Sequence, residues 1–117
     1  MLTQRLRHRV TFEEQVAVTE SSGEVIGHEW RIADVDGNLL ENVPAEVLTG
    51  PGREFEAADA KQSDTTARIA VRWFPGLLQS WRVLWEGKRY NITSIDTDAT
   101  ARKEWRLRCE DGPTDGA

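Results

Sequence analysis

The chain has 117 residues, the usual size of one domain, which excludes a second full hydrophobic core. Five Trp, three Phe and one Tyr give this core enough apolar surface to exclude a wholly disordered chain, although 30% of the residues are charged. The formal net charge of −5 excludes a general attraction to DNA or anionic lipid.

The chain has one cysteine, Cys109, which excludes an intramolecular disulfide and a multi-thiolate metal site. Residues 1–9 carry three arginines and a histidine before any apolar run, and no stretch approaches the roughly 20 apolar residues of a membrane span. We therefore expect synthesis in the cytoplasm, with no export signal and no membrane segment.

The N-terminal third predicts a β-hairpin. Apolar and polar residues alternate over residues 6–18, as in a strand with one buried face, and the polar parity begins with Arg5, Arg7 and Arg9. Residues 20–23 have turn composition, and a second strand is predicted over residues 25–32.

The middle of the chain combines a short strand with a long excursion. Residues 43–48 alternate as a strand, and Pro44 favours a sheet edge or a strand start, so we expect one side of this strand to be exposed. Strand periodicity is then absent from Thr49 to Thr66, and the composition of residues 53–62 favours a short helix. An excursion this long is usually functional or disordered.

The second half is strongly β. Strands are predicted over residues 67–74, 81–85, 90–95 and 104–110. A tight turn at residues 86–88 pairs the second and third of these strands, with a phase slip before Ile95.

These elements predict a mainly β fold: a small antiparallel β-barrel of about six strands, or a sandwich, with one long loop carrying a short helix. We expect a single domain over residues 1–110, with its excursion at residues 49–66, and a flexible tail over residues 111–117. Parity predicts that four tryptophans form the core and that Trp30 is more exposed; the four are Trp73, Trp81, Trp85 and Trp105.

Catalytic and metal motifs are not found. His8 and His28 fall on different strands without a neighbouring cysteine, so an ordinary strand histidine is the expected role of each. Residues 34–38 resemble the opening of a calcium loop but lack its later Gly and Glu, which indicates a turn. Cys109 lies on an apolar parity, where a core role is usual. We predict no enzyme activity and no cofactor.

Tryptophan and arginine are adjacent at residues 81–82 and 105–106, as in barrels that stack single-stranded nucleic acid. Parity weakens this interpretation, because the tryptophans point to the core while the arginines point outward among glutamates. A nucleic-acid-binding β-barrel module nevertheless stays open as an alternative.

Several segments resemble, in order, the head-tail joining proteins of tailed bacteriophages, also called head closure or stopper proteins. The segments are RLRHRV at residues 5–10, PAEV at 44–47, GREF at 52–55, IAVRW at 69–73, WRVLWEGKRYNI at 81–92 and EWRLRC at 104–109. The ordered set spans nearly the whole chain. One departure is the connection at residues 36–41, which is longer than is usual before the Ala-Glu-Val strand.

The resemblance implies a structural virion protein of the phage neck, made in the bacterial host cytoplasm. Such a protein forms a ring of several copies, docks on the portal and adaptor proteins, closes the DNA exit channel after packaging, and provides a surface for tail terminator or tail tube proteins. Packaged DNA is contacted only in the channel. A tail-terminator-type neck protein is a further alternative.

The resemblance also assigns residues to these roles. The excursion corresponds to a channel loop, for which we select Gly50, Gly52, Arg53, Glu54, Phe55, Glu56, Asp59, Lys61, Gln62 and Asp64. Acidic residues outnumber basic ones there, which suits a channel wall that repels DNA. Arg5, Arg7 and Arg9 are candidates for docking an acidic partner ring, and a solvated strand face is the alternative interpretation.

Overall fold

The computed structural model describes residues 5–49, 67–97, 100–101 and 103–111. In these ranges the chain is almost entirely β. The strands are β1 (His8–Thr19), β2 (Val25–Ile32), β3 (Asp34–Val35), β4 (Asn38–Leu39), β5 (Val43–Thr49), β6 (Ala67–Arg72), β7 (Arg82–Trp85), β8 (Lys88–Thr97) and β9 (Glu104–Asp111). No helix within the described ranges has the length and apolar character needed to cross a membrane.

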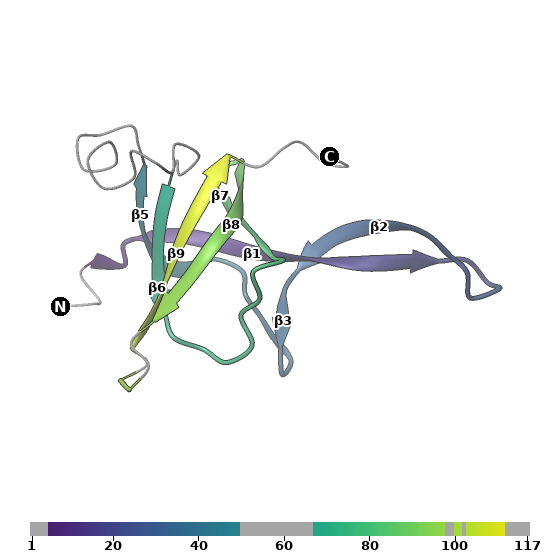
Figure 1. Ribbon diagram of the computed structural model, residues 1–117, viewed down its shortest axis with the longest axis horizontal. Coiled ribbons are helices and arrows are strands. Elements are labelled where there is room, and N and C mark those ends of the chain that lie inside the picture. Colours follow the sequence, from purple (N-terminus) through teal and green to yellow (C-terminus); the bar gives the residue numbers. More distant parts are fainter. Residues whose placement is uncertain (1–4, 50–66, 98–99, 102, 112–117) are drawn as a thin grey trace.

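Six strands form a closed antiparallel barrel in the order β1-β5-β6-β9-β8-β7 (Figure 1). The barrel closes where β1 also pairs with β7, with Phe12 opposite Val83. Closure gives every barrel strand two neighbours, so the barrel itself has no open sheet edge. The expected barrel of about six strands is therefore confirmed.

The core lies inside this barrel and contains the residues of inward parity. Phe12, Val83 and Cys109 are fully buried, and Trp81 is 5% exposed. Trp73, Trp85 and Trp105 are only partly buried, as is Trp30, so a core of four tryptophans is wrong in three members. Trp73 and Trp105 stack on each other with ring centroids 5.8 Å apart, just after β6 and at the start of β9.

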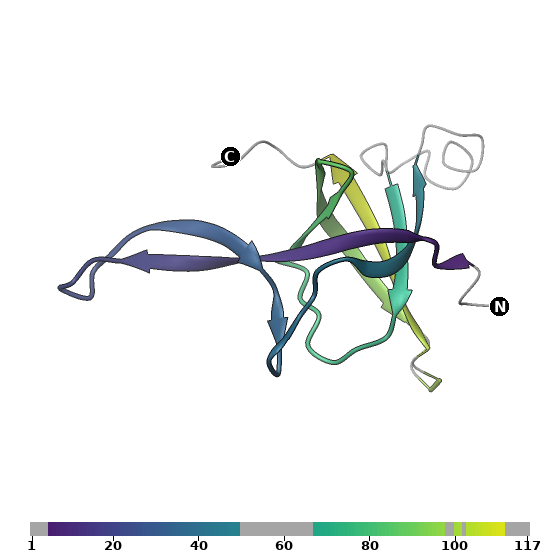
Figure 2. The same cartoon turned by 180° about the vertical axis from the view of Figure 1, so that it is seen from behind.

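The second half of β1 leaves the barrel and pairs with β2, which confirms the predicted hairpin. Seven pairs run from Glu13 opposite Ile32 to Thr19 opposite Val25. This hairpin, which we call the arm (residues 13–32), extends away from the barrel in both views (Figures 1 and 2). Because β2 pairs only with β1 among the described strands, its outer edge is free.

Turn chemistry accounts for the tight connections. Asp36 and Gly37 connect β3 to β4, and Glu86 and Gly87 connect β7 to β8, with positive φ at all four residues. These are the conformations of two-residue hairpin loops that match strand twist. The register of β8 against β9 shifts between Ile92 and Ser94, which confirms the predicted phase slip before Ile95.

The expected exposure of the strand containing Pro44 is wrong. β5 lies inside the sheet, between β1 and β6. Pro44 is its second residue and pairs with Arg9 of β1, whereas the pairing with β6 begins only at Ala45. Proline is tolerated there because it lies at the start of a strand. This was the second of the two positions predicted for Pro44, the first being a sheet edge. The short helix expected at residues 53–62 and tail residues 112–117 lie outside the described residues.

Candidate functional site

The outer wall of the barrel carries rows of charged residues across four strands. In one row, Glu46 of β5 is opposite Ala70 of β6, Ala70 is opposite Arg106 of β9, and Arg106 is opposite Asp96 of β8. Directly opposite residues of antiparallel strands share a face. Alternation along each strand therefore brings residues far apart in sequence onto one surface.

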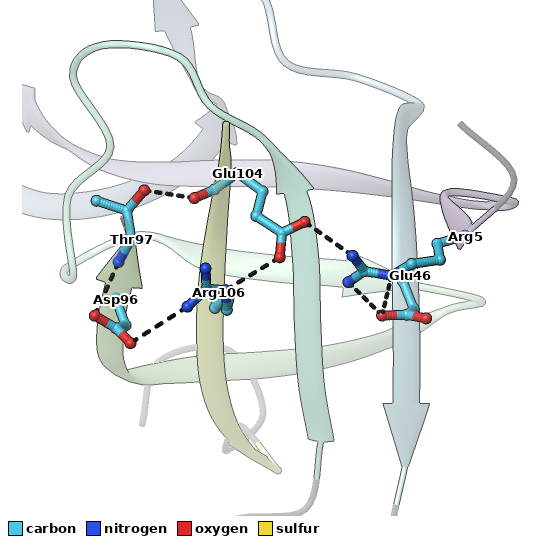
Figure 3. Close-up of polar contacts among 6 residues, drawn as sticks. All are labelled: Arg5, Glu46, Asp96, Thr97, Glu104 and Arg106. Carbon is cyan, nitrogen blue, oxygen red and sulfur yellow. Dashed lines mark hydrogen bonds and ion pairs between the residues drawn. The ribbon is translucent and has the colours of Figure 1, made fainter. Parts of the chain in front are cut away.

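Figure 3 shows how ion pairs connect this surface. Arg5 lies beside β5, with its Nη2 atom 2.8 Å from Glu46 Oε1 and its Nη1 atom 3.2 Å from Glu104 Oε2. Arg106 approaches the other oxygen of Glu104 at 3.1 Å and also faces Asp96. The hydrogen bond to Glu46 raises the pKa of Arg5. Glu104 is 9% exposed. Its carboxylate forms ion pairs with Arg5 and Arg106, which are far apart from each other in the sequence.

Arg5, Glu46, Asp96 and Arg106 also line a hollow, which we call the arginine groove. Its volume is about 270 Å³. Its floor lies over Ala70, which has no long side chain to fill the space. The lining residues are Arg5, Glu46, Leu48, Arg68, Ile69, Ala70, Ser94, Asp96, Arg106, Leu107 and Arg108. The groove is small compared with the roughly 300–1,000 Å³ of ligand pockets, and its charged lining is better suited to a protein side chain than to an enclosed small molecule.

A second charged cluster lies where the arm joins the barrel. Arg82 of β7 is 5% exposed, and its Nε atom donates to Glu13 Oε1 at 2.7 Å. Its guanidinium also stacks over the ring of Trp30 on β2, 4.1 Å from the ring centroid. One buried cation therefore contacts both strands of the arm at its base.

The titratable residues considered from sequence occupy structural positions. His8 accepts a hydrogen bond at Nδ1 from the Val47 amide and meets the ring of Trp85 edge to face. Burial raises the pKa of the Cys109 thiol to about 12, so it is protonated and unreactive at neutral pH. The side chain of Asp34 accepts a hydrogen bond from the Gly37 amide, as in an ordinary turn. Among the described residues, no three His, Cys, Asp or Glu side chains are close enough to hold a metal ion.

The selected channel-loop residues, from Gly50 to Asp64, lie outside the described residues. The structure does describe both ends of that excursion: Thr49, the last residue of β5, is directly opposite Ala67, the first residue of β6. The excursion therefore leaves the barrel and returns to it at neighbouring residues.

The three docking candidates are all exposed, but two of them have partners within the chain. Arg5 forms ion pairs with Glu46 and Glu104, Arg9 donates to the Asn42 carbonyl at 3.5 Å, and Arg7 is exposed.

The arginine groove was not predicted from the sequence. The available signal was the outward parity of Arg68, Arg106 and Arg108, but their meeting depends on the pairing of β6 with β9.

Comparisons with known proteins agree with this architecture. A family model described as phage head completion protein matches residues 1–112. The solution structure of protein SF1141 from Shigella flexneri 2a is similar, with a TM-score of 0.68 and 24% sequence identity over 97% of this chain and 99% of that one. At this identity the likeness shows the fold alone. No curated protein matches the sequence significantly.

Proposed function

From the premise that the chain belongs to the phage head completion protein family, whose model covers residues 1–112, we propose that it is the closure protein of the phage neck. A structural role in the phage head follows from the family itself. The finer proposal is that a ring of copies docks on the portal and adaptor complex, closes the DNA exit channel and receives the tail. The excursion at residues 49–66 is the closing element.

The observation that carries this proposal is the pairing of Thr49 with Ala67 at the two ends of the excursion. Both residues belong to strands that pair on each side within a closed barrel. The 17 residues of the excursion therefore begin and end at paired positions of the sheet, so the proposed closing role requires no rearrangement of the strands. Its four acidic residues, against two basic ones, would repel DNA while the segment blocks its path.

The docking role of the N-terminal arginines is part of the proposal. Arg7 is the best residue for testing it, because it is exposed, whereas Arg5 also holds the ion-pair cluster. Arg7→Glu would place a negative charge against an acidic partner ring, and we expect fewer joined particles. Lys103→Glu, at an exposed site just before β9, alters the charge by the same amount and in the same direction, and is the control for an altered surface charge.

Closure is tested by complementing a phage that lacks this protein with a variant lacking residues 53–62. We expect emptied heads with the variant still bound at the neck, counted by electron microscopy. A second variant replaces the ten residues by a Gly/Ser segment of equal length, which separates the loss of these side chains from the loss of length. Fully packed, infectious particles with both variants would contradict the closure role of the excursion.

The free protein is proposed to be monomeric or weakly associated, and to form its ring on a preassembled portal and adaptor. The outer wall of the barrel is rich in ion pairs, and few large apolar side chains are exposed within the described residues. Sedimentation at micromolar concentration tests this expectation. A stable ring of the purified protein alone would contradict it.

A further inference from the structure

The distal part of the arm has a distinctive chemistry. Residues 16–29 contain Glu20, Glu24 and Glu29 but neither lysine nor arginine. Val25 and Ile26, beside the turn, are 54% and 61% exposed, which places them among the most exposed large apolar residues of the described chain. An acidic hairpin end with uncovered apolar residues is suited to a positively charged surface that has its own apolar contact.

The arginine groove has the complementary chemistry. Its lining includes four arginines and two carboxylates, and Leu48 in the same lining is 46% exposed. The groove involves β5, which lies at the end of the barrel away from the arm in both Figures 1 and 2. The arm and the groove therefore occupy separate parts of one molecule.

We propose that the arm of one copy binds the arginine groove of the next copy in the ring, with Val25 and Ile26 against Leu48 and the arm glutamates facing the groove arginines. A contact between two different patches is heterologous, and repetition of such a contact generates a closed ring when the rotation between copies closes. The partner is thus a second copy of this chain. This inference rests on the proposed ring.

Disulfide crosslinking tests the contact directly. An Ile26→Cys protein is mixed with an affinity-tagged Leu48→Cys protein at high concentration under mild oxidation, so that heterodimers differ in mass from either homodimer. The native Cys109 is buried and does not compete. Leu78→Cys, at 54% exposure in the connection between β6 and β7, replaces Leu48→Cys as the matched control. We expect about tenfold more heterodimer with Leu48→Cys, because binding raises the local thiol concentration.

Charge substitutions test the electrostatic part. Adding Glu24→Arg to the Ile26→Cys protein should lower the heterodimer yield about fivefold, and 1 M salt should have a similar effect, since it reduces the Debye length to about 3 Å. Glu41→Arg, exposed and outside both arm and groove, should leave the yield unchanged. Equal losses with Glu24→Arg and Glu41→Arg would overturn the proposed charge pairing.

Two results would overturn the contact itself. Equal crosslinking to Leu48→Cys and Leu78→Cys, both in the concentrated free protein and in joined particles, would show random collision. A dominant Ile26→Cys homodimer would show that arms pair with each other, for example through the free edge of β2.

The Ile26→Cys and Leu48→Cys proteins are also oxidised together in joined particles. A negative result there, together with normal DNA retention, would reject the arm contact but leave the proposed closure function standing. Lost retention in the variant lacking residues 53–62 tests closure independently.

Discussion

Arg82 stacks over Trp30, with its guanidinium carbon 4.1 Å from the centroid of the indole ring. The same side chain donates to Glu13 at 2.7 Å, and its exposed fraction is only 5%. Glu13 and Trp30 belong to the two strands of the arm, whereas Arg82 belongs to β7 of the barrel. A charge buried this deeply requires its partners, because removal of one leaves the other without compensation. The arm is therefore fixed to the barrel at its base.

A double-mutant cycle should detect this connection. We expect Arg82→Met to lower the free energy of unfolding by about 3 kcal/mol, because Glu13 is left beside an apolar chain. Combined with Glu13→Gln, the loss should be about 1–3 kcal/mol smaller than the sum of the two single losses. Arg31 and Glu14 on the arm are 3.5 Å apart with Arg31 largely exposed, so the same cycle there should give at most about 0.5 kcal/mol. Equal coupling in both cycles would contradict a special role for Arg82.

Truncation of single tryptophans should separate the core from its periphery. Trp81 is 5% exposed and packs against Phe12 and Phe74, so Trp81→Ala should cost about 3–5 kcal/mol. Trp85 is partly buried and contacts His8 edge to face, so Trp85→Ala should cost about 1–2 kcal/mol. Chemical denaturation of both variants measures the difference. A larger loss for Trp85→Ala would show that its ring contributes more to the core than its exposure indicates.

Local patterns predicted the barrel strands well because each of these strands contributes buried residues to the core. The alternation around Phe12 and the turn at Glu86 and Gly87 needed only neighbouring residues to be read. Burial of tryptophan was overestimated, since parity gives the face of a residue but not its distance from the end of the barrel. Trp85 and Trp105 pack against the core and still remain partly exposed.

Features formed between strands that are distant in sequence could not be predicted from local sequence patterns. The closing pair of Phe12 with Val83 and the ion pairs of Arg5 connect residues separated by tens of positions in the chain. Alternation specifies which face a side chain takes, but the register between strands decides which side chains meet. The excursion was recognised as an interruption of periodicity, and the pairing of its two ends became visible only in the fold.

The buried thiol predicts a loss of stability at high pH. The pKa of Cys109 is about 12 in the folded protein, against a reference value of 9.0. Above pH 9 the unfolded chain releases this proton while the folded chain retains it, so the free energy of unfolding falls as pH rises toward 12. Between pH 8 and pH 10, the free energy of unfolding should fall by about 1.4 kcal/mol more in the wild type than in Cys109→Ala.

Denaturation of both proteins at the two pH values checks this difference. Desolvation, the largest cause, also raises the pKa of Tyr90, and it is present in both proteins; only the smaller electrostatic effect of Cys109 on Tyr90 differs between them. An identical pH dependence in wild type and Cys109→Ala would show that the thiol is not shielded from solvent.

Shortening the excursion should leave the barrel stable. The 17 residues from Gly50 to Thr66 connect paired positions, and removal of residues 53–62 leaves seven to make the same connection. Because closing a shorter loop costs less conformational entropy, the free energy of unfolding should rise by about 0.8 kcal/mol. The Gly/Ser replacement of equal length should stay within about 0.5 kcal/mol of the wild type. A loss of several kcal/mol in both variants would mean that the removed side chains stabilise the barrel, and failed closure in the particle would then follow from unfolding. Unchanged or increased stability makes emptied heads a direct measure of what the excursion does in the channel.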